Sequence, residues 1–199
     1  MDEATELIKK LGQSDDYFER QKAAWALVNL GAPSVDVVIE ALETGEFSDL
    51  RYKSAWILGK IKDRRAVEPL CRVLLNDSDH VVREWSAAAL EAIGSRDAVP
   101  KLVLSMKRDS SKDVRLRSAM ALRSLRATEE LRDLLRYSDP EIRGMAVTGL
   151  AKIGDRESLA DVARLLVDED LEVRRRSAAY MAESPYDEAL NCLAKALQD

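Results

Sequence analysis

Residues 79–94 read DHVVREWSAAALEAIG, and this stretch decides the fold. Asp79 is a good helix N-cap, because its carboxylate can accept hydrogen bonds from the backbone N–H groups of the first turn. Apolar and small residues then follow at helical spacing, and Gly94 stands where a left-handed residue ends a helix. A second amphipathic segment begins near Asp97 and ends at about Lys107. The stretch therefore predicts two helices joined by a tight turn.

The same pattern recurs six times along the 199 residues of the chain. Each copy carries one arginine, and successive arginines stand 31, 32, 32, 28 and 31 residues apart. Small or apolar side chains recur four, seven and ten residues after most of these arginines. Because one short helical pair cannot bury its own apolar face, copies at this period predict a stacked array. The recurring residues are Arg20, Arg51, Arg83, Arg115, Arg143 and Arg174.

An array grows by repeats and has no single globular centre, so we expect one all-α solenoid domain over residues 1–199. Residues 4–11 are expected to form an additional helix that caps the N-terminal end. The short 28-residue gap predicts a short second helix from Glu129 to Arg136. In the last copy, Ser184-Pro185 breaks the pattern, and a closing helix is expected from about Asp187 to Gln198. The six copies are predicted near residues 15–43, 47–76, 79–108, 111–136, 139–167 and 170–198.

Residues 79–107 resemble a HEAT repeat of the subclass found in phycobilin lyases. The pattern of that subclass, roughly D-x-x-V-R-x-x-A-A-x-A-L-x-x-I-G-D, is matched by copy three, by residues 139–155 and partly by residues 170–181. Copy two departs from it, with Phe47 at the capping position and Lys62 in place of the glycine. The resemblance implies an α-α superhelix with the first helices on the convex side and the second helices lining a concave groove. It implies no single activity, because this repeat serves as a scaffold in unrelated proteins.

The row of arginines has two interpretations, an anion-binding ladder or a set of contacts between repeats. Four of the arginines follow an aspartate by four residues, which places both side chains on one flank of the helix. A fixed position in a repeat is usually an inter-repeat contact. We therefore interpret the row as a structural ladder. The resemblance implies that each arginine pairs with a capping aspartate or a helix carbonyl of the adjacent repeat; the aspartates are Asp16, Asp79, Asp139 and Asp170.

The overall composition narrows the class of protein. The chain has 31 basic and 36 acidic side chains and a net charge of −5, which argues against a dedicated nucleic-acid binder with a basic stripe. Cys71 and Cys192 stand in non-neighbouring copies, so we expect no structural disulfide and a reducing, cytoplasmic compartment. The sequence opens without a secretory signal pattern, and no run of 18 apolar residues predicts a membrane span.

No group of residues predicts catalysis or a bound cofactor. His80 is the single histidine, and it has no histidine or cysteine neighbour at ligand spacing. HEAT-repeat proteins include di-iron hydroxylases, a family that needs several His-Glu pairs, whereas His80 is followed by Val81. Glycine-rich phosphate loops are absent, and Cys71 lies on the apolar face of its helix as a small core residue would. We predict no catalytic residue, no metal and no cofactor, and we favour a protein without enzymatic activity.

The aromatic residues predict an exposed strip. On a helical wheel, Trp25 and Trp56 lie about 140° from the arginine, whereas the apolar face centres at about 290°. A contiguous exposed apolar patch usually marks a surface for a protein partner or for a second copy of the chain. In the alternative interpretation, helix tilt packs these side chains against the neighbouring repeat. The predicted strip consists of Trp25, Tyr52, Trp56, Trp85, Leu116 and Met120.

The outward positions of the second helices predict a groove of mixed charge. Acidic side chains dominate its N-terminal half, and the basic ones gather towards the C-terminal half. Both a solvated face and a groove that binds a peptide or protein show this pattern, and the sequence leaves the two open. The groove residues are Asp36, Glu40, Glu68, Arg72, Glu129, Asp133, Arg164 and Lys195.

Three functions follow as hypotheses. The first is a non-enzymatic scaffold that binds a protein or peptide through the groove, the tryptophan-bearing face, or both. The second, implied by the resemblance, is a phycobilin lyase subunit or a related protein that handles a tetrapyrrole chromophore. The third is a HEAT-type binder of DNA lesions, which would need a basic groove.

Overall fold

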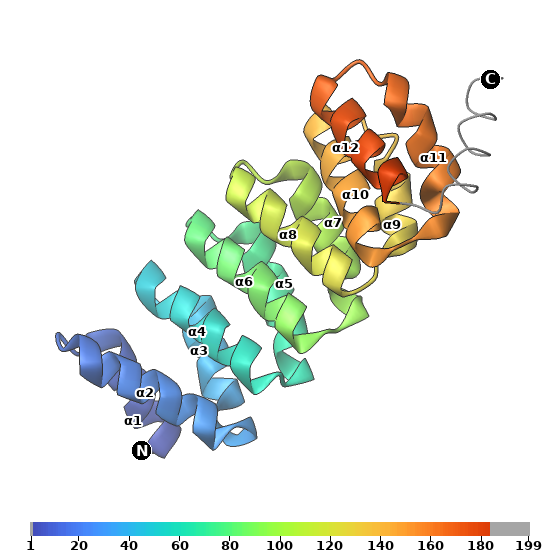
Figure 1. Cartoon of the computed structure of the whole chain (residues 1–199). Coiled ribbons are helices and arrows are strands. Elements are labelled where there is room, and N and C mark those ends of the chain that lie inside the picture. Colours follow the sequence, from blue (N-terminus) through green and yellow to red (C-terminus); the bar gives the residue numbers. More distant parts are fainter. Residues whose placement is uncertain (1, 184–199) are drawn as a thin grey trace. The chain divides into compact units, whose positions relative to one another are not determined.

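The computed structural model describes residues 2–183, and over these residues it contains twelve α-helices and no β-strand. The predicted closing helix from Asp187, and the groove residue Lys195, lie outside the described residues. The chain divides into two compact units, residues 1–121 and 122–199. The all-α solenoid expected from the repeats is confirmed by this succession of helical pairs (Figure 1).

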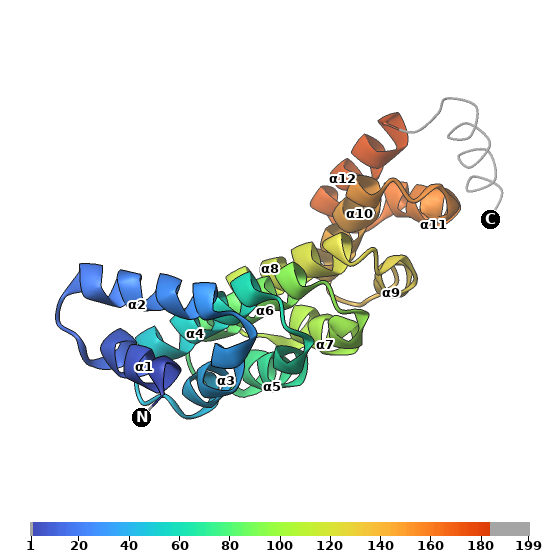
Figure 2. The same ribbon diagram turned by 90° about the horizontal axis from the view of Figure 1, so that it is seen from below.

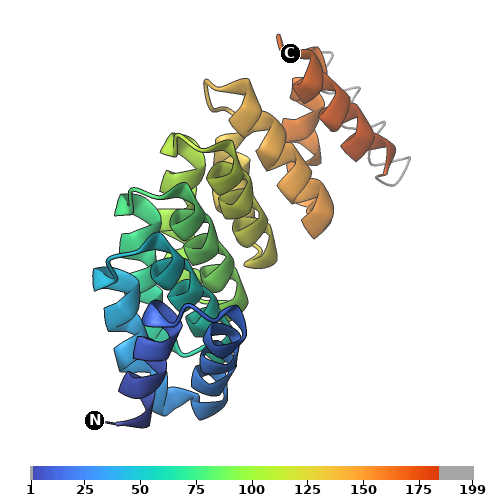
Figure 3. The same ribbon diagram turned by 90° about the vertical axis from the view of Figure 1, so that its left-hand side faces the viewer.

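The first unit begins with the predicted N-terminal helix and continues with helical pairs. First helices lie in one layer and second helices in another, as Figure 2 shows, and Figure 3 shows the pairs stacked one behind the next. Helix α8 (Lys112–Ser124) ends just beyond the boundary of the unit. The other helices are α1 (Glu3–Gln13), α2 (Tyr17–Leu30), α3 (Val35–Thr44), α4 (Ser48–Ile61), α5 (Val67–Asn76), α6 (His80–Ile93) and α7 (Val99–Arg108).

Helix ends follow the capping pattern of the sequence. Asp16 and Asp79 accept a hydrogen bond from the backbone N–H two residues later, which caps α2 and α6. Gly94 ends α6 in the left-handed region, with φ of 77°. In copy two, Phe47 offers α4 no side-chain cap, and Lys62 takes the left-handed conformation with φ of 61°. A residue with a Cβ adopts that conformation at a cost of about 1–2 kcal/mol, so the ends of α4 are less favourable than those of α2 and α6.

In the first unit, a 3₁₀ turn precedes each second helix. The segment Arg96–Ala98 is such a turn, and α7 starts at Val99, so the start expected near Asp97 falls inside the turn. The equivalent turns are Ala32–Ser34 before α3 and Arg64–Ala66 before α5. This tight connection sets each second helix antiparallel to its first helix.

The core lies between the two layers and between neighbouring pairs. Leu27, Leu58 and Leu90, each seven residues after an arginine, are fully buried, and so are many alanines of the same helices. Burial of such apolar surface contributes about 25 cal/mol per Å² and holds the array together. Small side chains let adjacent first helices approach closely: a Cβ added to Gly59 of α4 would stand 2.9 Å from the Cα of Ala89 in α6.

We predict that Gly59→Ala destabilises the protein even though alanine favours helices by about 1 kcal/mol. The added methyl group would meet the backbone of α6, so the two helices would have to separate. Gly144→Ala is the matched control, because a Cβ there would meet only the flexible side chain of Arg176 at 3.3 Å. Thermal melts should show a lower midpoint for Gly59→Ala and an equal or higher one for Gly144→Ala. Equal effects of the two substitutions would contradict the close approach of α4 and α6.

The second unit repeats the plan with shorter second helices. Helix α9 (Thr128–Leu134) ends two residues before the predicted end at Arg136, and α11 (Leu159–Arg164) continues as a 3₁₀ turn. The first helices α10 (Pro140–Ile153) and α12 (Leu171–Ala182) are capped by Asp139 and Asp170. A left-handed residue, Arg126, precedes α9 with φ of 52°.

Over residues 2–183, no single helix has the length and apolar character to cross a membrane. One bent pair, Tyr17–Leu30 with Ala32–Thr44, meets the length and composition test only when both helices are taken together.

Candidate functional site

Each arginine of the repeating row is fixed to the turn that precedes its own helix. In all six copies the Nη1 atom donates to the backbone carbonyl of the residue six positions earlier, at 2.6–3.0 Å. The accepting residues are Ser14, Gly45, Asp77, Asp109, Tyr137 and Asp168. The row therefore ties each first helix to the end of the preceding second helix.

Arg51, Arg83 and Arg143 also form a two-pronged ion pair with the aspartate that directly follows the second helix of their own helical pair. Arg51 donates from Nε and Nη2 to Asp77, and Arg83 does the same to Asp109. In the second unit, Arg143 pairs in this way with Asp168, and both side chains are almost completely buried. Such planar, bidentate pairs are the strong form of an ion pair.

The aspartate in these pairs is not the one expected from the sequence. The capping residues Asp16, Asp79, Asp139 and Asp170 accept from backbone N–H groups of their own helices. The partner instead stands six residues before the next arginine, at the end of the intervening second helix. Asp77, Asp109 and Asp168 share that spacing, so a signal for the pairing is present in the sequence.

These contacts lower the pKa values of the paired aspartates. The hydrogen bonds from Arg143 lower the pKa of Asp168, and burial opposes them only in part. Burial raises the pKa of Asp109, but the hydrogen bonds from Arg83 and Ser111 outweigh it, so the pKa lies below its usual value. Each carboxylate is therefore held in its charged form beside a guanidinium, as a structural ion pair requires.

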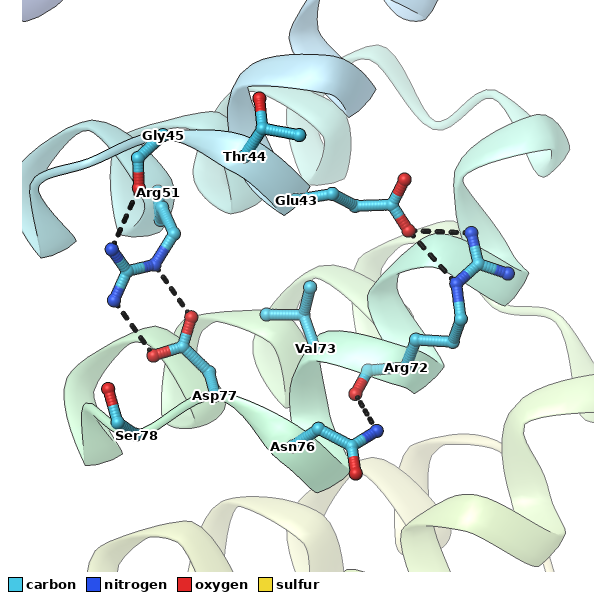
Figure 4. A pocket seen from close by; sticks show the side chains of 9 residues that line it. All are labelled: Glu43, Thr44, Gly45, Arg51, Arg72, Val73, Asn76, Asp77 and Ser78. Atoms are coloured by element: carbon cyan, nitrogen blue, oxygen red, sulfur yellow. Dashed lines mark hydrogen bonds and ion pairs between the residues drawn. The ribbon is translucent and has the colours of Figure 1, made fainter.

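A cavity of about 430 Å³ lies beside one of these pairs, where α3, α4 and α5 meet (Figure 4). Arg51 spans from the carbonyl of Gly45 to Asp77, and on the opposite side Arg72 donates to Glu43 at 2.6 Å. Both guanidinium groups thus already face carboxylates. The lining of this cavity consists largely of contacts between repeats.

The predicted groove residues are exposed over the described part of the chain, and several form ion pairs, two of them with a side chain of the neighbouring repeat. Asp36 pairs with Arg65 at 3.0 Å, and Arg72 pairs with Glu43 and, at 3.7 Å, with Glu68. In the second unit, Arg164 pairs with Asp161. Glu40, Glu129 and Asp133 are exposed as well. The structure thus places the basic members of the groove against acidic side chains.

The predicted aromatic strip lies on the layer of first helices. Trp25 is 50% exposed, Trp85 37% and Leu116 47%, whereas Tyr52, Trp56 and Met120 are half-buried. The rings contact each other between helices: Trp25 meets Trp56 edge to face at 5.1 Å, and Tyr52 stacks on Trp85 at 6.4 Å. Both interpretations of the sequence apply in part, because each ring packs on a neighbouring repeat while several remain open to solvent.

Two exposed aromatic residues extend this strip and are missing from the sequence prediction. Tyr17 and Phe18 begin α2, contact each other edge to face, and are more than half exposed. Phe18 stands seven residues before Trp25, so a helical wheel extended by one turn places both on the same side of the helix. We call Tyr17, Phe18, Trp25, Tyr52, Trp56, Trp85 and Leu116 the aromatic face.

Cys71 and His80 are the side chains that were considered for catalysis or metal binding, and each occupies a position typical of a structural residue. Burial raises the pKa of Cys71 to about 11, so its thiol is protonated at neutral pH and a poor nucleophile. His80 is exposed at the start of α6. Among the described residues, no three histidine, cysteine, aspartate or glutamate side chains are grouped to hold a metal ion.

The stacked helical pairs and the arginine row define the class of the protein. The chain belongs to the HEAT repeats family, whose profile matches residues 35–123 and 128–199. A profile of the PBS lyase HEAT-like repeat matches residues 19–44, in copy one. The resemblance inferred from residues 79–107 is thereby confirmed.

The chain is similar to proteins of two kinds. It is 35% identical over 106 residues to the phycocyanobilin lyase subunit alpha of Picosynechococcus sp., covering 49% of this chain and 39% of the relative. It is 28% identical to the bilin biosynthesis protein PecE of Nostoc sp., covering 79% and 67%. It is also 28% identical to the deoxyhypusine hydroxylase of Arabidopsis thaliana, covering 85% and 55%. The chain thus spans only part of the length of each of these relatives.

Solved structures share the fold. The complex of CpcE and CpcF of phycocyanin lyase from Nostoc sp. PCC7120 aligns with a TM-score of 0.56 at 23% identity, covering 99% of this chain and 87% of that chain. An engineered protein aligns with a TM-score of 0.52 at 21% identity, covering 98% of both chains. At these identities the likeness establishes the HEAT-repeat solenoid and no activity.

Proposed function

We propose that this chain is a subunit of the phycobilin-lyase type, a HEAT-repeat protein that binds a second protein and helps to transfer a bilin chromophore. The observation that carries the proposal is the 35% identity over 106 residues to a phycocyanobilin lyase subunit, supported by the similarity to PecE. These similarities favour this alternative over a scaffold without chemistry. We also infer that the six repeats form one continuous array, which the family match supports.

The similarity to deoxyhypusine hydroxylase supports the repeat architecture but not that activity. The family needs several His-Glu pairs, and the chain has one histidine, His80, followed by Val81. The bilin-related proteins therefore remain the better guide to function.

A protein partner is common to the lyase hypothesis and the scaffold hypothesis. The aromatic face supports the existence of a protein partner, because Trp25 and Phe18 expose large apolar rings that a partner would bury. Tryptophan and tyrosine are also the side chains that most often dominate binding energy in interfaces. The solved CpcE and CpcF structure is itself a complex of two proteins.

The lyase function is tested by mixing the chain with phycocyanobilin and the apoprotein of phycocyanin, with and without a second lyase subunit. We expect the chain to accelerate covalent attachment of the bilin, read by zinc-enhanced fluorescence of the phycocyanin band in denaturing gels. Attachment at the background rate in both mixtures would contradict the proposal and leave the scaffold as the better hypothesis.

The role of the aromatic face is tested by Phe18→Ser combined with Trp25→Ala. At least half of each side chain is exposed, so we expect unchanged helicity but about tenfold weaker capture of the second lyase subunit in pull-down titrations. Val167→Ser removes an even more exposed apolar side chain, from the second unit, and serves as the control. Equal capture by the double variant and the control would exclude this face as the docking surface.

A further inference from the structure

A second cavity of about 430 Å³ lies on the layer of first helices, between α4 and α6. Its walls are the indole rings of Trp56 from α4 and Trp85 from α6. Each indole also contacts a second ring: Trp56 meets Trp25 edge to face, and Trp85 stacks on Tyr52. The volume falls within the range of small-molecule sites, and these ring contacts restrain the two indoles. We call this cavity the indole slot.

The floor of the indole slot consists of the smallest side chains. Gly59 comes from α4, and Ala88, Ala89 and Ala92 recur at helical spacing along α6. The close approach of the two helices at Gly59 leaves a narrow floor without branched side chains. A narrow apolar slot between aromatic walls fits a flat conjugated ring system better than a bulky aliphatic one.

The lining of the indole slot also carries positive charge. Lys60 and Lys62 are its only charged members among the described residues that line it, and neither faces a carboxylate within that lining. The Nζ atom of Lys60 lies 5.7 Å from the centre of the Trp56 ring. Lys62 occupies the left-handed position that glycine holds in copies one, three and five, so a strained backbone presents an ammonium group at the slot.

We propose that the indole slot binds a planar conjugated molecule that carries a carboxylate. The rings would stack between Trp56 and Trp85, and the carboxylate would pair with Lys60 and Lys62. The chemical class follows from the slot alone, whereas the identity of the biological ligand as a bilin rests on the proposed function. This assigns a ligand site to the layer of first helices rather than to the groove.

The probe is biliverdin, a linear tetrapyrrole with two carboxylates, and its dimethyl ester is the matched neutral probe. Titration of the full chain, followed by tryptophan fluorescence quenching and bilin absorbance, should give a binding constant for biliverdin and about tenfold weaker binding of the ester. Equal binding of the two probes would overturn the role of the lysines.

Two variants locate the site. Ala88→Leu fills the slot and should weaken biliverdin binding by about tenfold. Lys62→Gly should also weaken binding severalfold while raising the melting temperature, because glycine adopts the left-handed conformation without strain. Arg126→Gly is the control, because Arg126 has the same left-handed conformation but does not line the slot. It should raise the melting temperature and leave biliverdin binding unchanged.

The outcomes separate this inference from the proposed function. If Ala88→Leu and Lys62→Gly both bind biliverdin as tightly as the wild type does, the slot is not the ligand site, even if bilin transfer to phycocyanin is observed. Loss of biliverdin binding in both variants, without any bilin transfer by the wild type, would uphold the slot and contradict the lyase function.

Discussion

Asp109→Ala is expected to lower the free energy of unfolding of the first unit by about 3–5 kcal/mol, because it leaves a buried guanidinium without its partner. Arg83 and Asp109 are joined by two hydrogen bonds of 2.8 Å, and both side chains are nearly buried. The substitution also removes the acceptor for the backbone N–H of Ser111. Urea titration followed by tryptophan fluorescence measures this loss, because all three tryptophans lie in the first unit.

Arg136→Ala is the control for that measurement. Its ion pair with Asp161 is nearly as short, at 3.0 Å, but the Arg136 side chain is 77% exposed. An exposed pair contributes about 0–1 kcal/mol, so this variant should unfold nearly as the wild type does, as followed by circular dichroism. A cost for Asp109→Ala no larger than that of Arg136→Ala would show that the arginine row does not hold the repeats together.

Acidification is expected to remove the stabilisation that these pairs supply. The pKa of Asp168 is lowered by its hydrogen bonds to Arg143, and those of Asp109 and Asp155 are lowered by Arg83 and Arg132 against the opposing effect of burial. A carboxyl group with a lowered folded pKa stabilises the protein above its unfolded pKa of about 4. That contribution is lost as the pH falls through the lower, folded value.

The melting temperature should therefore change little from neutral pH to about pH 5 and then fall steeply towards pH 3. Asp109→Asn should begin with a lower melting temperature and show a shallower fall, since one of the titrating groups is gone. Differential scanning calorimetry across this range measures both curves. A wild-type curve that stays flat below pH 4 would contradict the assignment of these aspartates as charged partners.

Most of the fold could be predicted from the sequence because the repeat determines it locally. A capping aspartate recurs in four copies, a leucine seven residues after the arginine in five, and a glycine at the helix end in three. The main deviations occur where a copy departs from the pattern. Lys62 takes a strained conformation in place of glycine, and α9 is shorter than expected.

The partners of the arginines were harder to predict because they depend on how the end of the second helix lies against the first helix. The helical wheel places Arg83 and Asp79 on one flank, but it carries no information on where other helices lie. Only the structure shows that Asp109 from the end of α7 reaches the guanidinium. The same reason applies to the groove, where Arg72 lies on Glu43 of the preceding repeat.

The aromatic face was predicted in part. The wheel placed Trp25 and Trp56 on the outer side of their helices, and it also contained the signal for Phe18. It could not show that Trp56 and Trp85 enclose a slot, because that depends on how closely α4 and α6 pack at Gly59.

The central claim is that binding resides on the aromatic face, whereas the repeated arginines build the array. Site-specific photo-crosslinking tests it directly, with benzoylphenylalanine in place of Trp25 on the aromatic face or of Glu40 in the groove. Both positions are exposed, so neither replacement should disturb the fold. In the mixture with the second lyase subunit, our account predicts a covalent adduct with that subunit from position 25 and none from position 40. An adduct from position 40 alone would contradict it.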